Sequence, residues 1–249
     1  MPDVQQSNIG ASNFSATQES SVSEYMTALL DRLKSESVKN QLQLLQELAT
    51  SDEAGLKTLM SFLSDRRSTA PSLIDGRAYQ ILRASNSSKV QEFLQAQFPQ
   101  GLVPLISEQS VDYSSLQDLL ARQEFQAADR LTVEKMCELA GALAVQRKWL
   151  YFTEAEQLPV VDLQTINTLW QVYSEGKFGF SVQRELWLST GKNWEALWSL
   201  IGWKSGNNWT RYPQEFTWDL SAPRGHLPLS NQLRGVRVIS ALLNHPAWD

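Results

Sequence analysis

Residues 112–141 read DYSSLQDLLARQEFQAADRLTVEKMCELAG, and the spacing of their apolar residues predicts two helices joined by a short turn. Asp112 is placed to cap the first helix and Gly141 to end the second. The apolar positions on one face are Leu116, Leu119 and Leu120 in the first helix, and Phe125, Ala128, Leu131, Met136 and Leu139 in the second. This stretch predicts a helical hairpin and an all-α fold.

Toward the N-terminus, residues 23–98 show the same helical periodicity. Thr50 followed by Glu53 has the form of a capping box that would begin the third helix of this region. The five apolar stripes are Tyr25, Leu29, Leu30 and Leu33; Val38, Leu42, Leu45 and Leu48; Leu56, Leu59, Met60 and Leu63; Ala78, Ile81 and Leu82; and Val90, Phe93, Leu94 and Phe98. They predict a helical bundle or helix-pair repeats, serving as a scaffold or binding a partner protein.

Changes in composition divide the chain. Residues 1–22 are rich in Ser, Gln and Asn without apolar periodicity, which predicts a disordered tail, and they lack the features of a secretory signal or a transit peptide. Pro and Gly punctuate residues 99–111, which predicts a linker before a second unit over 112–249. No apolar run approaches the ~18 residues that span a bilayer. We expect a cytoplasmic protein.

Beyond the hairpin the expected helices become short and are separated by Gly, Pro and Asn. Asp162, Ser181 and Asn193 are each placed to cap one of them, and a last helix is expected from about residue 230 to Leu243. The intervening residues 203–230, WKSGNNWTRYPQEFTWDLSAPRGHLPLS, show no helical pattern and predict a long loop. A loop of that length inside a compact domain points to function.

Composition argues against the common classes of enzyme and against general nucleic-acid binding. The chain carries 22 basic and 27 acidic residues, a formal net charge of −5, whereas nucleic-acid binders carry a basic excess. One cysteine and two histidines leave little for a disulfide, a metal site or histidine-based acid–base chemistry. We find no phosphate-binding loop or dinucleotide fingerprint, and we expect no metal site and no covalently bound cofactor.

All nine tryptophans lie between Trp149 and Trp248. Residues 177–249 are also the basic part of the chain, with 8 basic and 5 acidic side chains, a net of +3. Three interpretations follow: a tryptophan-rich core, a single-stranded nucleic-acid surface, or a site for a flat apolar ligand with anionic edges that arginines would pair. The core interpretation is preferred for Trp170, Trp187, Trp194 and Trp198, and both core and ligand site stay open for Trp209, Tyr212 and Phe216.

Several long segments of residues 112–249 resemble a known family, the tetrapyrrole-binding "genomes uncoupled" regulators that activate magnesium chelatase in chlorophyll biosynthesis. The N-terminal helices resemble the accessory helical-repeat domain of cyanobacterial members. The segments that carry the resemblance are DYSSLQDLL (112–120), AADRLTVEKM (127–136), RKWLYFTEAEQLPVVDLQTINTLW (147–170), GKFGFSVQRELW (176–187), IGWKSGNNWTRYPQEFTWDLSAPRGHLP (201–228) and NQLRGVRV (231–238).

The resemblance implies an all-helical core shaped like a cupped hand, in which the long loop and the last helix form part of a porphyrin cleft. It implies binding of protoporphyrin IX and Mg-protoporphyrin IX, association with the large porphyrin-binding subunit of magnesium chelatase, and no catalysis by the chain itself. Tyr212 departs from the family pattern, which has Trp there. The expected porphyrin-binding residues are Phe152, Arg211, Tyr212, Asn231 and Arg234, joined by Arg237, Trp209 and Leu143; Leu158 is left open between cleft and core.

Two other functions remain as alternatives at this point. The chain could be a sensor of an open-chain bilin that acts as a protein-interaction module, or an enzyme acting on tetrapyrroles with His226 as its acid–base group. The segment around His226 is more typical of a turn with a structural histidine. A peripheral association with thylakoid membranes also stays open, although no amphipathic anchor is evident.

Overall fold

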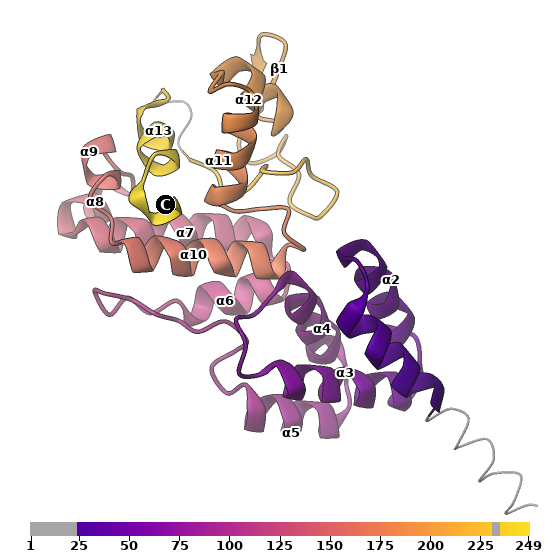
Figure 1. The fold of residues 1–249 in the computed structure, drawn as a ribbon. Helices are drawn as coiled ribbons and strands as arrows, with labels where there is room; N and C mark the ends of the chain where they lie inside the picture. The colour runs from indigo at the N-terminus through magenta and orange to yellow at the C-terminus, as the bar shows by residue number, and fades with distance from the viewer. Residues whose placement is uncertain (1–23, 231–234) are drawn as a thin grey trace, which may run out of the picture. The chain divides into compact units, whose positions relative to one another are not determined.

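The computed structural model describes residues 24–230 and 235–249, and these are predominantly helical, as expected (Figure 1). The expected tail over residues 1–22 lies outside the described residues. The chain divides into two compact units. Among the described residues, the first unit comprises 24–70 and 81–97, and the second comprises 71–80 and 98–249 except 231–234.

The first unit is made of helices whose buried side chains are mainly aliphatic. Residues 24–35 are helical, followed by α2 (Val38–Ala49), α3 (Asp52–Arg66), the last residues of α4 (Leu73–Ala84) and α5 (Ser88–Gln97). Helix α3 packs against both α2 and α5. The buried side chains include Leu29, Leu33, Leu44, Leu45, Leu48, Leu59, Phe62, Leu63, Leu82, Val90 and Leu94. All five expected helices are therefore present, although Val38 is exposed rather than buried.

The expected capping box at the start of α3 is wrong. Thr50 closes α2 instead, because its hydroxyl donates to the Glu47 carbonyl (2.8 Å). Glu53 pairs with Lys89 (2.7 Å). Only Thr50 and Ser51 separate the two helices, so Thr50 is already used at the end of the first.

The second unit is built around the predicted helical hairpin, α6 (Ser114–Ala121) and α7 (Phe125–Ala140), with α10 (Val160–Tyr173) packed on α6. Asp112 accepts a hydrogen bond from the Ser114 backbone (2.8 Å), but the N-cap residue of α6 is Tyr113, so the expected cap at Asp112 is wrong; Gly141 ends α7 with φ 101°. Gly76 of α4 lies so close to α10 that an added Cβ would be 2.0 Å from the Val172 carbonyl oxygen. Two short helices were not expected from the sequence: α8 (Ala142–Arg147) and α9 (Phe152–Ala155).

The remaining elements contain five of the nine tryptophans. They are α11 (Phe180–Ser189), α12 (Trp194–Leu200), the two-residue strands β1 (Lys204–Ser205) and β2 (Asn208–Trp209), α13 (Arg237–Leu243) and the 3-10 turn η2 (Pro246–Trp248). The strands pair antiparallel, and residues 210–230 contain no helix, as expected. None of the helices in the described residues is both long and apolar enough to cross a membrane.

The predicted helix starts are partly wrong. Asn193 caps α12 as expected, accepting from the Ala196 backbone (3.1 Å). Asp162 and Ser181 do not cap, because α10 begins at Val160 and α11 at Phe180, so both residues lie inside helices. The last helix begins at Arg237, later than residue 230, and residues 235–236 are not helical.

Buried polar side chains tie the 99–111 segment to the rest of the second unit. Asp162 accepts from the Tyr113 hydroxyl (2.6 Å) and from the Glu108 backbone (2.9 Å). Gln117 accepts from the Val103 backbone (2.8 Å) and from the Tyr173 hydroxyl (2.6 Å). Because buried polar groups are costly without partners, these bonds hold the irregular segment in one place.

Candidate functional site

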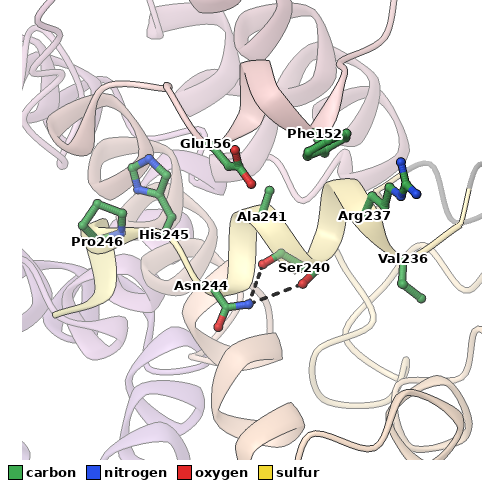
Figure 2. A pocket seen from close by; sticks show the side chains of 9 residues that line it. All are labelled: Phe152, Glu156, Val236, Arg237, Ser240, Ala241, Asn244, His245 and Pro246. Atoms are coloured by element: carbon green, nitrogen blue, oxygen red, sulfur yellow. Dashed lines mark hydrogen bonds between the residues drawn. The ribbon is translucent and has the colours of Figure 1, made fainter.

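A groove of about 680 Å³ lies between α9 and α13 (Figure 2). This volume is within the range of roughly 300–1,000 Å³ that is usual for small-molecule sites. Helix α13 presents residues spaced three and four apart along the groove, while Ile239, Leu242 and Leu243 are buried beneath it. The described lining residues are Phe152, Glu156, Val236, Arg237, Ser240, Ala241, Asn244, His245 and Pro246.

One end of the groove combines an aromatic ring with a cation. The Arg237 guanidinium lies 5.5 Å from the centroid of the Phe152 ring. Arg237 is exposed and Phe152 is half-buried. Figure 2 shows this pair at one end of the groove and His245 with Pro246 at the other. This end can therefore offer an apolar face and a positive charge to the same ligand.

The other polar groups of the groove differ in charge. Glu156 is exposed and is the carboxylate among the described lining residues. Asn244, the C-cap residue of α13, donates through its side chain to the Ser240 carbonyl (2.9 Å). His245 is buried, and burial lowers its pKa. At neutral pH, Arg237 is therefore the positive group among the described lining residues, and an anionic ligand would be oriented by it.

A second set of expected site residues lies on the loop that follows α12 and does not belong to the described lining of the groove. Trp209 is half-buried in β2, whereas the side chain of Arg211 is 86% exposed and Tyr212 is 47% exposed. Tyr212 packs against Phe216 and Trp218, with ring centroids 6.4 and 5.9 Å away. The structure therefore places an aromatic cluster here with an exposed arginine beside it.

The structure brings two of the expected site residues together, Phe152 and Arg237. Asn231 and Arg234 lie outside the described residues. Leu143 is 72% exposed on α8 and does not belong to the described lining of the groove. Leu158 is buried at 3% exposure, which places it in the core.

An acidic residue beside the loop was missed by the sequence reasoning. Asp129 of α7 is buried and accepts a hydrogen bond from the Leu229 backbone (2.6 Å). Burial raises its pKa from 3.8 to about 7. Burial and the Asp129 charge also raise the pKa of Tyr212. The sequence could have pointed to Asp129, because this acidic residue lies in the apolar stripe of α7, next to the buried Ala128.

His226 has a structural role. The Thr217 backbone donates to its Nε2 (3.2 Å), so Nδ1 carries the proton and donates to the Ile201 carbonyl (2.7 Å). Burial lowers the pKa of His226, which favours this neutral form. Both ring nitrogens are thus engaged in holding the loop, in agreement with the interpretation of His226 as a structural residue.

Sequence reasoning also missed most of the residues on the groove side of α13. Glu156, Ser240 and Asn244 belong to no recognisable motif. The spacing from Arg237 to Ala241 and Asn244 is the signal that could have grouped the residues on this side of α13. Within residues 24–230 and 235–249, no three His, Cys, Asp or Glu side chains form a group that could hold a metal ion.

Two family models match the chain. The model described as GUN4-like matches residues 106–246, and the model described as ARM-like repeat domain, GUN4-N terminal, matches residues 17–99. The "Ycf53-like protein" of Synechocystis sp. is 50% identical over 229 residues, covering 92% of this chain and 98% of that protein. The "Tetrapyrrole-binding protein, chloroplastic" of Arabidopsis thaliana is 35% identical over 150 residues, covering 57% of each.

Two solved structures are similar to a little more than half of the chain. The structure of GUN4 from Chlamydomonas reinhardtii superposes with a TM-score of 0.55 at 42% identity, covering 59% of this chain and 93% of that one. The ligand-free structure of Arabidopsis thaliana GUN4 superposes with a TM-score of 0.52 at 35% identity, covering 58% of this chain and 99% of that one.

Proposed function

The chain belongs to the GUN4-like family, and from this premise we propose that it is a non-catalytic regulator that binds a tetrapyrrole. The observation that carries the proposal is the groove between α9 and α13, with Arg237 over the Phe152 ring at one end. A relative that is 35% identical bears the name tetrapyrrole-binding protein, which supports the same ligand class.

The groove fits the physical demands of a flat apolar ligand. Phe152, Val236 and Ala241 offer apolar surface along the groove. If about 300 Å² of ligand surface leaves water at about 25 cal/mol per Å², the gross gain is about 7 kcal/mol. Association entropy offsets much of that gain, so polar contacts at the rim decide the net affinity.

Charge gives the ligand an orientation. A carboxylate of the ligand would pair with the Arg237 guanidinium, which can form two parallel hydrogen bonds. The Glu156 carboxylate would repel it, so the anionic edge of the ligand points toward Arg237 and its apolar edge toward Glu156 and His245. A dicarboxylate porphyrin, with both carboxylates on one edge, meets this requirement.

The loop residues Trp209, Arg211 and Tyr212, with Asn231 and Arg234, complete the proposed site as a second wall. The exposure of Arg211 and Tyr212 supports this assignment, because both side chains are accessible to a ligand. Leu143, also exposed, is assigned to the outer rim.

The finer assignments rest on the family. The proposed ligands are protoporphyrin IX and Mg-protoporphyrin IX, bound without a covalent link. The proposed partner is the large porphyrin-binding subunit of magnesium chelatase, whose activity the chain would raise, with the N-terminal helices as a scaffold or second partner-binding surface. The proposed location is the cytoplasm of a cyanobacterial cell, with peripheral association at the thylakoid.

The site can be tested by titrating tryptophan fluorescence with deuteroporphyrin IX, a soluble dicarboxylate porphyrin. Arg237→Ala should weaken binding by about 10- to 140-fold, because a hydrogen bond to a charged group contributes about 1.5–3 kcal/mol. Arg224→Ala is the matched control, since Arg224 pairs with Glu185 (2.5 Å) outside the groove and the loop wall. Equal porphyrin affinities of the two variants would show that Arg237 does not contact the ligand.

The two walls can be separated with further variants. Phe152→Ala reports on the groove, and Arg211→Ala and Arg234→Ala report on the loop wall. If only the loop variants weaken binding, the ligand does not occupy the α9–α13 groove. The regulatory part is tested by adding wild type or Arg237→Ala to magnesium chelatase: the wild type should raise the rate, and the variant should need more porphyrin for the same rate.

A further inference from the structure

The groove between α9 and α13 holds two opposite charges that do not neutralise each other. Arg237 lies at the end with Phe152, and Figure 2 shows Glu156 between that pair and His245. Within residues 24–230 and 235–249, no ion pair joins Glu156 to Arg237 or to another cation. Both charges are therefore presented to the ligand that occupies the groove.

The other glutamate of this segment is used differently. Glu154 pairs with Arg147 (2.5 Å) and accepts a hydrogen bond from the Tyr151 backbone (2.8 Å), so its charge is compensated by its own segment. Glu156 is the C-cap residue of α9 and is exposed. Among the described residues, its carboxylate makes no hydrogen bond that would hold it in the fold. The charge of Glu156 is therefore available to act on a ligand.

The end of the groove beside Glu156 supplies no positive charge among the described lining residues. His245 Nδ1 accepts a hydrogen bond from the Ala247 backbone (3.1 Å), and burial lowers the pKa of His245, so the ring is neutral at neutral pH. The Asn244 amide donates to the carbonyl (2.9 Å) and the hydroxyl (3.4 Å) of Ser240, as Figure 2 shows. A carboxylate at this end would meet a like charge with no cation to pair with it.

The apolar part of the lining makes the contrast sharper. Val236, Ala241 and Pro246 give the groove apolar surface. Methyl, vinyl and ethyl substituents of a porphyrin gain free energy when they leave water for such a surface. A carboxylate instead loses its hydration, and burial of an anion without a partner is costly. Repulsion by the Glu156 carboxylate adds to that cost.

We propose that Glu156 makes the groove selective for tetrapyrroles whose carboxylates all lie on one edge, because it repels a carboxylate on the opposite edge. This inference rests on the proposed function, in which Arg237 pairs with the anionic edge. Arg237 then favours the correct ligand and Glu156 disfavours the wrong one, and specificity is the difference between the two affinities. The rejected ligands are porphyrins with a carboxylate on every pyrrole ring, such as coproporphyrin and uroporphyrin.

The test uses two porphyrins that differ only in this respect. Mesoporphyrin IX and coproporphyrin III share the ring, the methyl groups and two propionates on one edge. On the opposite edge mesoporphyrin IX has two ethyl groups, where coproporphyrin III has two further propionates. Affinities of the full chain are measured near neutral pH by titration of the Soret absorption of each porphyrin. The wild type should bind mesoporphyrin IX more tightly than coproporphyrin III.

Glu156→Gln removes the charge and keeps the size of the side chain. It should tighten binding of coproporphyrin III by about 3- to 10-fold, as expected for charges in water-exposed surroundings, and change the affinity for mesoporphyrin IX by less than about twofold. Glu92→Gln is the matched control, because Glu92 is an exposed glutamate of α5 outside the described lining. It changes the net charge equally and should leave both affinities unchanged.

Salt distinguishes repulsion from a change in shape. Repulsion between like charges is screened as the ionic strength rises, so the preferences of wild type and Glu156→Gln should differ less in about 0.5 M salt than in about 0.05 M salt. A gain in coproporphyrin III binding that does not depend on salt would mean that the substitution altered the shape of the groove, and would contradict the inference.

The remaining outcomes separate the inference from the proposed function. A wild type that binds coproporphyrin III at least as tightly as mesoporphyrin IX, or an unchanged preference in Glu156→Gln, overturns the inference and leaves the proposed function standing. The same change of preference in Glu92→Gln also overturns the inference, because net charge would then be the cause. Failure of the wild type to bind either porphyrin overturns both.

Discussion

The two units of the chain have the same secondary structure but are stabilised by different side chains. The interior of the first unit is aliphatic, with Leu45 and Leu48 fully buried, and its charged pairs, such as Lys89 with Glu53, are on the surface. The interior of the second unit is aromatic and contains buried polar groups, among them Asp162 and Gln117. A core of aliphatic side chains tolerates small changes in side-chain shape, whereas a buried polar group needs its hydrogen-bond partner in one position.

The difference between the units can be measured, because all nine tryptophans lie in the second one. Tryptophan emission during unfolding follows the second unit, while far-ultraviolet circular dichroism follows the helices of both. A variant of the first unit that shifts only the circular dichroism transition would show that the units unfold separately.

The largest effect is expected for Asp162→Ala. Its loss leaves the Tyr113 hydroxyl and the Glu108 backbone without this acceptor, and each unsatisfied buried group costs about 1–3 kcal/mol. We expect the free energy of unfolding of the second unit to fall by about 2–6 kcal/mol, measured by tryptophan emission in urea. Asp162→Asn keeps an acceptor oxygen and should lose less; equal losses would contradict the hydrogen-bond explanation.

Leu45→Ala should be the most damaging of these changes in the first unit. Leu45 is fully buried, and truncation of a buried leucine to alanine costs about 2–5 kcal/mol because it leaves a cavity. The circular dichroism transition should move to lower urea while the tryptophan transition stays in place. An equal shift of both transitions would mean that the units unfold together.

Asp129→Asn should stabilise the second unit, and more so as the pH rises. The folded carboxyl has a pKa of about 7 and the unfolded one about 3.8, so between these values the folded state holds the additional proton. Stability of the wild type therefore falls as the pH rises through this window, and the cost is fully present above about pH 7. The variant does not titrate here, so its advantage, on the order of a few kcal/mol, should grow from about pH 5 to about pH 8. An advantage that does not change with pH would rule out this carboxyl as the cause.

The smallest effect is expected for Lys89→Ala in the first unit. Lys89 and Glu53 are 2.7 Å apart, but their side chains are 74% and 79% exposed. Water and salt screen such a pair, so we expect no resolvable shift of the circular dichroism transition. A shift comparable to that of Leu45→Ala would contradict the view that the aliphatic interior stabilises this unit.

Helices with a long apolar period were predictable and short ones were not. The helices of residues 24–97 and the α6–α7 hairpin follow from periodicity, whereas α8 and α9 have only six and four residues, too few to show a period. The sequence predicts Asp162 as a helix cap, because a cap and a buried acceptor both need a short side chain with an oxygen. Only its contacts with Tyr113 and Glu108 distinguish the two roles.

The residues of the candidate site were also only partly predictable from the sequence. Residue type and family resemblance pointed to Phe152 and Arg237, which meet in the α9–α13 groove. Glu156 and Asn244 also line this groove, yet nothing in their local sequence marks them. Their positions depend on how α13 packs beside α9, and that contact joins residues about 85 positions apart in the chain.

The sequence by itself determined the helical class, the aliphatic stripes of the first unit, the concentration of tryptophan after residue 148 and of positive charge after residue 176, and the family. These properties are local or compositional, so a one-dimensional pattern is sufficient to show them. The tertiary structure decided which residues share the groove, that Asp129 and Asp162 are buried, and that Trp187, Trp194, Trp198 and Trp203 stack on one another. Each depends on contacts between segments distant in the chain, whose free energies are set by burial and geometry rather than by the neighbouring residues in the sequence.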